Sequence, residues 1–237
     1  MERFLTLCLA LFAAWSFFSC KPAAEFPPPT PRFIATAIDP SGTTAGKDWP
    51  MPDSLFFQHI IDSLMLCGGY LYVYNLGRRV PRPVILHILC KQENTDVWVS
   101  DYGEKKQAND SIEQRNGRSV KQFWAVLNAE LFQYRPAESD DYTYLLPAIQ
   151  SLCHSLNSAA FRPFRQYALL YTDFIHHEKD RAPVRLGAAQ LEPLTQTPAR
   201  VFFSTYADTA GYGGLKVAWL GGPEEFLLAS LASKEAP

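Results

Sequence analysis

Short apolar runs alternate with amphipathic stretches along most of this chain, and this alternation limits the fold more than any other sequence feature. Helical spacing of apolar residues predicts helices over 54–66, 144–157 and 224–233, and another from about Ser119. Asp53 is the expected N-cap of the first helix. The runs that suit buried strands are 33–38, 71–76, 84–89, 167–172, 201–204 and 217–220. Strands alternating with helices predict an α/β fold, with a Rossmann-like, mostly parallel central sheet and helices on both faces.

One long stretch in the middle of the chain shows no period. Residues 97–99 suit a short strand, and residues 103–118 are polar throughout much of their length. Because a polar segment without a period favours a loop, we expect 103–118 to be a mobile surface loop.

The beginning of the chain has the pattern of an export signal. Residues 4–18 are almost entirely apolar, and a helix of about 15 residues would reach only ~22 Å, too short for a permanent membrane span. The run ends in Phe17-Phe18-Ser19-Cys20, which resembles a loose, Bacteroidetes-type lipobox. That resemblance implies that residues 1–19 are removed and that Cys20 is lipidated. The alternative is a plain N-terminal anchor helix.

A proline-rich stretch follows Cys20, with five prolines among residues 21–31. Such a stretch favours extended polyproline geometry, so we expect residues 20–32 to be a tether. One domain would then cover residues 33–237. We expect it in the cell envelope, periplasmic or surface-exposed, and held to the membrane by the lipid anchor alone.

Composition narrows the choice of function. The formal net charge is -2 and there is no long basic run, so the chain lacks the electrostatic footprint of a nucleic-acid-binding protein. Hydrophobic residues make up 47% of the chain, which suits a single domain with an ample core. No nucleophile–base pair and no H-E-x-x-H motif is evident, so we do not expect an enzyme.

Three cysteines fall in the expected domain, namely Cys67, Cys90 and Cys153, each within an apolar run. Their spacing is not that of metal ligands, and we interpret them as buried thiols. A disulfide between Cys67 and Cys90 is the alternative in an oxidising compartment.

Oxygen-bearing side chains follow the first expected strand, in the segment Asp39-Pro40-Ser41-Gly42-Thr43. The carboxylate and the two hydroxyls alternate, so they can face the same side of a tight turn. Hard oxygen ligands suit Mg²⁺, and less specifically Mn²⁺ or Ca²⁺. Ligands of parallel sheets bind at the carboxyl ends of strands, which makes Asp39, Ser41 and Thr43 candidate metal ligands.

This segment resembles the D-x-S-x-S/T signature of von Willebrand factor A (vWA) domains, which begins their metal-ion-dependent adhesion site (MIDAS). Two more parts of that family's pattern are present. Thr143 is followed six positions later by the aliphatic Ile149, and Leu169-Leu170-Tyr171-Thr172-Asp173 matches an apolar-apolar-Thr-Asp segment. Phe174 stands where the family has glycine, and we expect it to crowd the loop. The resemblance covers most of residues 33–222.

The resemblance implies a role for each candidate ligand. Ser41 and Thr43 would coordinate the ion directly, and Thr143 directly or through water. Asp39 and Asp173 would act mainly through waters and supply negative charge. One open coordination position would be filled by an acidic side chain of a protein partner.

The leading hypothesis is therefore a non-enzymatic, envelope-anchored vWA-like module that binds a protein partner through a divalent cation. A vWA-like fold that has lost its metal and serves as a scaffold for envelope assembly stays open. So does an Mg²⁺-dependent phosphatase, because residues 39–43 also resemble the first motif of haloacid-dehalogenase-type phosphatases. Asp39 would then be the nucleophile and Thr172 part of the second motif, although Ser41 replaces the second aspartate.

A histidine pair, His176-His177, lies near Glu178 and Asp180 and suggests a second metal site only weakly. Adjacent side chains in an extended segment point in opposite directions, so we interpret this segment as a solvated loop.

Overall fold

The computed structural model describes residues 30–40, 52–91, 99–133 and 142–231, and of residues 99–102 and 231 it describes the backbone alone. The expected signal peptide, Cys20 and most of the tether lie outside these residues, as do Ser41 and Thr43. Within the described part of the chain, no helix is both long enough and apolar enough to cross a membrane.

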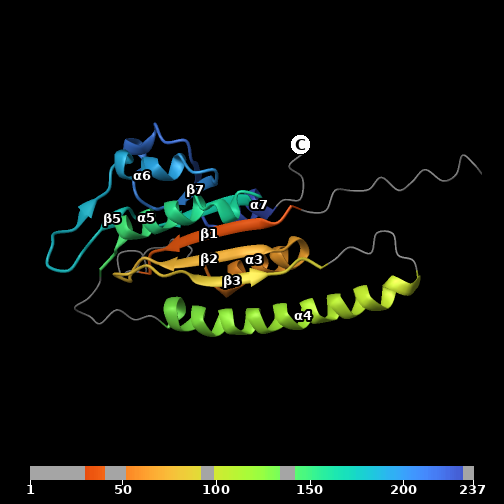
Figure 1. Ribbon diagram of the computed structural model, residues 1–237. Coiled ribbons are helices and arrows are strands. Elements are labelled where there is room, and N and C mark those ends of the chain that lie inside the picture. Colours follow the sequence, from red (N-terminus) through yellow and green to blue (C-terminus); the bar gives the residue numbers. More distant parts are fainter. Residues whose placement is uncertain (1–29, 41–51, 92–98, 134–141, 232–237) are drawn as a thin grey trace, which may run out of the picture.

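A six-stranded sheet forms the centre of the fold, in the order β3-β2-β1-β4-β7-β8 (Figure 1). The edge strand β3 runs antiparallel to β2, and every other neighbouring pair in this sheet is parallel. The strands are β1 Arg32–Ile38, β2 Gly69–Asn75, β3 Val84–Ile88, β4 Arg165–Tyr171, β7 Arg200–Ser204 and β8 Ala218–Leu220. The prediction of an α/β fold with a mostly parallel sheet is confirmed.

Helices cover both faces of the sheet. They are α3 Ser54–Cys67, α4 Val99–Leu127, α5 Leu145–Leu156, α6 Ala188–Thr195 and α7 Pro223–Leu231. One hydrophobic cluster joins α3, α4 and α7 to one face, and a second joins α5 and α6 to the other. Strand β1 contributes side chains to both clusters, because successive side chains of a strand point to opposite faces of the sheet. Ile34 belongs to the first cluster and Phe33 to the second.

Helix α3 begins where the sequence predicted. The side chain of Asp53 accepts a hydrogen bond of 2.8 Å from the backbone N–H of Phe56, as an N-cap does. The buried face of α3 includes Phe57, Ile60 and Leu64. These apolar residues at helical spacing account for its packing against the sheet.

The expected loop over 103–118 is wrong, because α4 runs unbroken through it and continues into a π-helical turn over Asn128–Phe132. Its contact with the sheet edge is partly polar: the Asn116 side chain donates to Leu89 O at 2.9 Å and accepts from Leu89 N at 3.0 Å. Apolar packing begins only further along, with the partly buried Val120 and the buried Phe123, in the part where a helix was expected from about Ser119. A helix held by a buried amide leaves no apolar stripe in the sequence. The expected strand at 97–99 is also not formed at Val99, which is helical, and its other residues lie outside the described part.

A short hairpin after β4 was missed by the sequence patterns. It pairs β5, Ile175–His176, with β6, Val184–Arg185. Two residues per strand are too few to show an alternation, so this hairpin is visible only in the structure.

Candidate functional site

Asp39 lies at the carboxyl end of β1, where the strand order of the sheet reverses between β1 and β4. Its backbone N–H donates to Tyr171 O at 3.0 Å, which continues the pairing of β1 with β4 past the end of β1. The residue is completely buried. Ligands of open α/β sheets bind at this kind of switch point, so Asp39 occupies the position where the fold favours a site.

Thr143 reaches the same point from the loop that precedes α5. Its hydroxyl lies 3.3 Å from Asp39 Oδ1 and 3.5 Å from Asp39 Oδ2. The loop is held on both sides, since Thr143 exchanges backbone hydrogen bonds with His177, and Tyr144 N donates to Leu76 O at 2.7 Å beside the end of β2. The structure therefore brings together two of the predicted ligands, Asp39 and Thr143.

Thr172 completes the surroundings of the Asp39 carboxylate from the end of β4. Its hydroxyl lies 3.4 Å from Asp39 Oδ2 and accepts a hydrogen bond of 3.2 Å from the backbone N–H of Phe174. The sequence placed Thr172 in the vWA-like segment but gave it a role only in the phosphatase alternative. Its contact with Asp39 follows from the parallel pairing of β1 with β4, which no local pattern reveals.

Asp173 is the third predicted ligand that the structure describes, and it is buried too. Its Oδ1 accepts from Ile175 N at 2.9 Å, and its Oδ2 accepts from the hydroxyl of Tyr206 at 3.1 Å. The carboxylate thus lines a cavity of about 400 Å³ together with Tyr206 and Arg185. Among the described contacts, Asp173 makes no hydrogen bond to Thr143.

The two carboxylates nevertheless act on one shared group. The pKa of Tyr206 is raised to about 12: burial contributes most, Asp173 adds to it through its charge and its hydrogen bond, and Asp39 adds more weakly, whereas Arg185 lowers it. Burial followed by the charge of Asp39 likewise raises the pKa of Tyr171. Asp39 at the end of β1 and Asp173 after β4 therefore both act on Tyr206. The sequence did not single out Tyr206.

Phe174 adopts a backbone conformation that glycine favours, with φ of 64°. A non-glycine residue in the left-handed region costs about 1–2 kcal/mol. The ring is completely buried and packs against Phe203, Tyr212 and Trp219. The expectation that Phe174 crowds the loop is wrong, because its ring is buried in the hydrophobic core and its backbone adopts the left-handed conformation that a glycine would adopt here.

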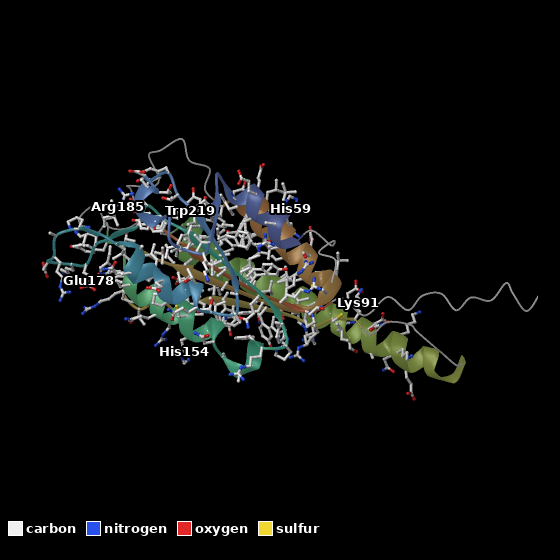
Figure 2. The ribbon with its side chains drawn as sticks, turned by 90° about the horizontal axis from the view of Figure 1, so that it is seen from above. His59, Lys91, His154, Glu178, Arg185 and Trp219 are labelled. Atoms are coloured by element: carbon white, nitrogen blue, oxygen red, sulfur yellow. The ribbon has the colours of Figure 1, made fainter. Side chains whose placement is uncertain are left out.

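His176 supports the Thr143 loop from the β5–β6 hairpin. Its Nδ1 lies 3.1 Å from Thr143 O, and its Nε2 lies 3.2 Å from Glu178 Oε1. Figure 2 shows Glu178 and Arg185 together at the hairpin end of the molecule. The interpretation of this segment as a solvated loop is wrong for His176, which is buried. His177 points elsewhere, with its ring 5.1 Å from that of Tyr142.

The donor set at this site consists of oxygens. Carboxylates and hydroxyls are the ligands that Mg²⁺, Mn²⁺ and Ca²⁺ prefer, so Asp39, Thr143 and Asp173 fit a hard cation in chemistry. Among the described residues, no three His, Cys, Asp or Glu side chains gather in a metal-binding cluster. A cation here would consequently need hydroxyl ligands as well as carboxylates.

A comparison of this chain with models of known protein families gave no match, and a comparison with curated proteins gave none either. The function of the site is therefore argued from its residues.

Proposed function

We propose that the chain is an envelope-anchored, vWA-like binding module that engages a protein partner through a divalent cation. The observation that carries this proposal is the approach of the Thr143 hydroxyl to within 3.3 Å of the Asp39 carboxylate, at the switch point of the sheet. The vWA resemblance pairs these two residues, and the chain separates them by 104 positions.

The electrostatics of the site support a cation. Asp39 and Asp173 are 0% and 2% exposed, and burying an ionised carboxylate costs several kcal/mol unless other charges compensate it. The hydroxyls of Thr143 and Thr172 approach Asp39 at 3.3–3.5 Å, longer than the ~2.7–2.8 Å usual for O–H···O bonds. A divalent cation would offset both carboxylates at once, and Ser41 and Thr43 would add hydroxyl ligands as the resemblance implies.

The charges of Asp39 and Asp173 also indicate which kind of protein partner would bind. Two buried carboxylates at the end of the sheet repel an acidic ligand when no cation is present. With a cation bound, one open coordination position attracts an acidic side chain. Binding of an acidic partner would therefore depend strictly on the metal, and the lipid anchor expected at Cys20 would hold the module at the membrane.

Thermal unfolding of the full chain tests whether a divalent cation binds to the folded protein. The chain is unfolded in EDTA and then in millimolar Mg²⁺ or Mn²⁺, beside Asp39→Asn and the control Asp62→Asn. Asp62 is an exposed carboxylate on α3 that accepts from Gln58. A cation that binds only the folded state at 100 times its Kd adds about 2.7 kcal/mol. We expect the metal to raise Tm in the wild type and in Asp62→Asn, and not in Asp39→Asn.

The result separates the proposal from the metal-free scaffold. Asp39→Asn keeps the size of the side chain, and its far-ultraviolet circular dichroism shows whether it is folded. If the folded wild type gains no stability from either ion, the metal proposal fails and the scaffold becomes the better account.

One contact favours the phosphatase as a second candidate. Thr172 Oγ1 lies 3.4 Å from Asp39 Oδ2, which joins the two residues that the phosphatase resemblance assigns to its first two motifs. Its test is Mg²⁺-dependent hydrolysis of p-nitrophenyl phosphate by the wild type and by Asp39→Asn. Hydrolysis that is lost in the variant would support an enzyme, and absence of hydrolysis would dismiss it.

A further inference from the structure

The three described cysteines differ in their surroundings. Cys67 is the last residue of α3 and is buried, whereas Cys90 follows β3 and is exposed. Cys153 lies on α5, across the sheet from α3, and is partly buried. The expectation of buried thiols therefore holds for Cys67 and not for Cys90. All three are thiols in the structure.

Cys67 and Cys90 both lie close to the same end of the β2–β3 pair. Gly69 pairs with Ile88 at this end, Cys67 precedes Gly69 by two positions, and Cys90 follows Ile88 by two positions. Disulfides span ~4.4–6.8 Å between Cα atoms, so a bond between these cysteines requires the two segments to approach closely.

Gly68 shows independently how close the two segments are. A Cβ at this position would lie 2.9 Å from both the Cβ and the backbone nitrogen of Cys90, and Gly68 has a φ of 74°. Only glycine allows this approach, so the end of α3 and the start of the segment after β3 are in direct contact. Burial raises the pKa of the Cys67 thiol, Arg32 lowers it, and the nearby Cys90 raises it again, which means that the two sulfurs lie within electrostatic range.

We propose that Cys67 and Cys90 form a reversible disulfide in an oxidising compartment, with an external disulfide as the oxidant. The exposed Cys90 thiolate attacks the external disulfide and forms a mixed disulfide, releasing one thiol. The Cys67 thiolate then attacks the Cys90 sulfur and releases the second thiol. Two protein thiols are oxidised to one disulfide, and one external disulfide is reduced to two thiols.

The bond would hold the end of α3 to the segment after β3, which contacts the middle of α4. Lys91 follows Cys90 directly and forms an ion pair of 2.9 Å with Glu113 of α4. Figure 2 shows Lys91 at the opposite end of the domain from Glu178 and Arg185, so the bond lies far from the Asp39 site. It is therefore independent of the proposed metal, and its failure would leave that proposal untouched.

The test compares the full chain equilibrated with oxidised glutathione and with a phosphine reductant. Remaining thiols are alkylated, the protein is digested, and the peptides are mapped by mass spectrometry. We expect one linked peptide pair containing Cys67 and Cys90 after oxidation, with Cys153 alkylated. Closing this loop should raise Tm by roughly 5 °C in the wild type.

Single serine variants provide the controls. Cys67→Ser and Cys90→Ser should lose both the linked peptide and the rise in Tm, and Cys153→Ser should keep both. If the oxidised wild type carries glutathione on Cys90 with Cys67 still alkylated, the proposal is wrong. A linked pair that contains Cys153 or Cys20 in place of either residue would overturn it equally.

Discussion

The hydroxyl of Thr143 lies 3.3 Å from the carboxylate of Asp39, although 104 positions separate the two residues in the chain. The contact joins the loop before α5 to the end of β1. Backbone hydrogen bonds fix that loop, from Tyr144 to the end of β2 and between Thr143 and His177 of the hairpin segment. The position of the hydroxyl is therefore set by the sheet rather than by α5 alone.

Replacing this hydroxyl should weaken the stabilisation by metal that we propose. In Thr143→Val, the rise in Tm caused by Mg²⁺ or Mn²⁺ should fall to a fraction of the wild-type rise, because the ion loses an oxygen ligand. Thr143→Ser should retain most of it. Thr197→Val is the matched control, since Thr197 is a buried threonine whose hydroxyl donates to Leu194 O at 2.7 Å. An undiminished rise in Thr143→Val would remove Thr143 from the site.

At position 174 a glycine variant should be more stable than an alanine variant, which is the reverse of the usual order. Both Phe174→Ala and Phe174→Gly lose the buried ring, which costs about 3–5 kcal/mol. Because φ is 64°, alanine keeps the strain that glycine relieves, and Phe174→Gly should be the more stable of the two by about 1 kcal/mol. Urea denaturation measures the difference.

Phe203 supplies the control for that order. It is completely buried in β7 and its ring packs against Phe174. At this strand position glycine should be less stable than alanine by about 0.5–1 kcal/mol. The same order of stability at both positions would show that the left-handed turn at Phe174 is not formed in solution.

Asn116 should anchor α4 to the sheet. It is 1% exposed, and its amide satisfies both backbone groups of Leu89. Asn116→Ala leaves those groups without their partner, so the free energy of unfolding should fall by about 1–3 kcal/mol. Gln114→Ala, at an exposed position of the same helix, should change it by less than about 0.5 kcal/mol. Equal effects of the two variants would mean that α4 does not pack on β3 as described.

Tyr74 should make the fold sensitive to alkali. Burial raises its pKa to about 12, and its hydroxyl lies 2.8 Å from Ser155 Oγ. In the unfolded chain a tyrosine ionises near ~10. The unfolded state therefore releases a proton above that pH which the folded state keeps, and stability is full below pH ~10 and falls as pH rises towards ~12.

The decline assigned to Tyr74 amounts to roughly 2–3 kcal/mol. Tyr74→Phe should remove that part, so its urea midpoint should fall less steeply than that of the wild type between pH ~10 and ~12. Parallel declines in the two proteins would contradict the effect of burial on Tyr74.

The elements that the sequence predicted are those whose cause is local. Asp53 caps α3, and β1 and β4 are continuous apolar runs, as buried parallel strands require. The last part of α4, from about Ser119, was predicted from its apolar spacing, whereas the part before it was missed because a buried asparagine forms its contact with the sheet. The antiparallel direction of β3 was missed because an apolar run carries no sign of its direction.

The candidate site also contains some residues that the sequence predicted and others that only the structure reveals. Asp39, Thr143 and Asp173 could be named in advance because each ends a strand or precedes a helix in a recognisable order. Thr172 and Tyr206 join them only through the pairing of β4 with its neighbours β1 and β7. Contacts of that kind depend on the three-dimensional fold, and a single sequence does not display them.

Calorimetric titration of the EDTA-treated full chain with Mn²⁺ tests the central proposal most directly. The account predicts saturable binding of one ion by the wild type and loss of that binding in folded Asp39→Asn. Wild-type affinity in Asp39→Asn, or no saturable binding to the wild type at millimolar Mn²⁺, would contradict it.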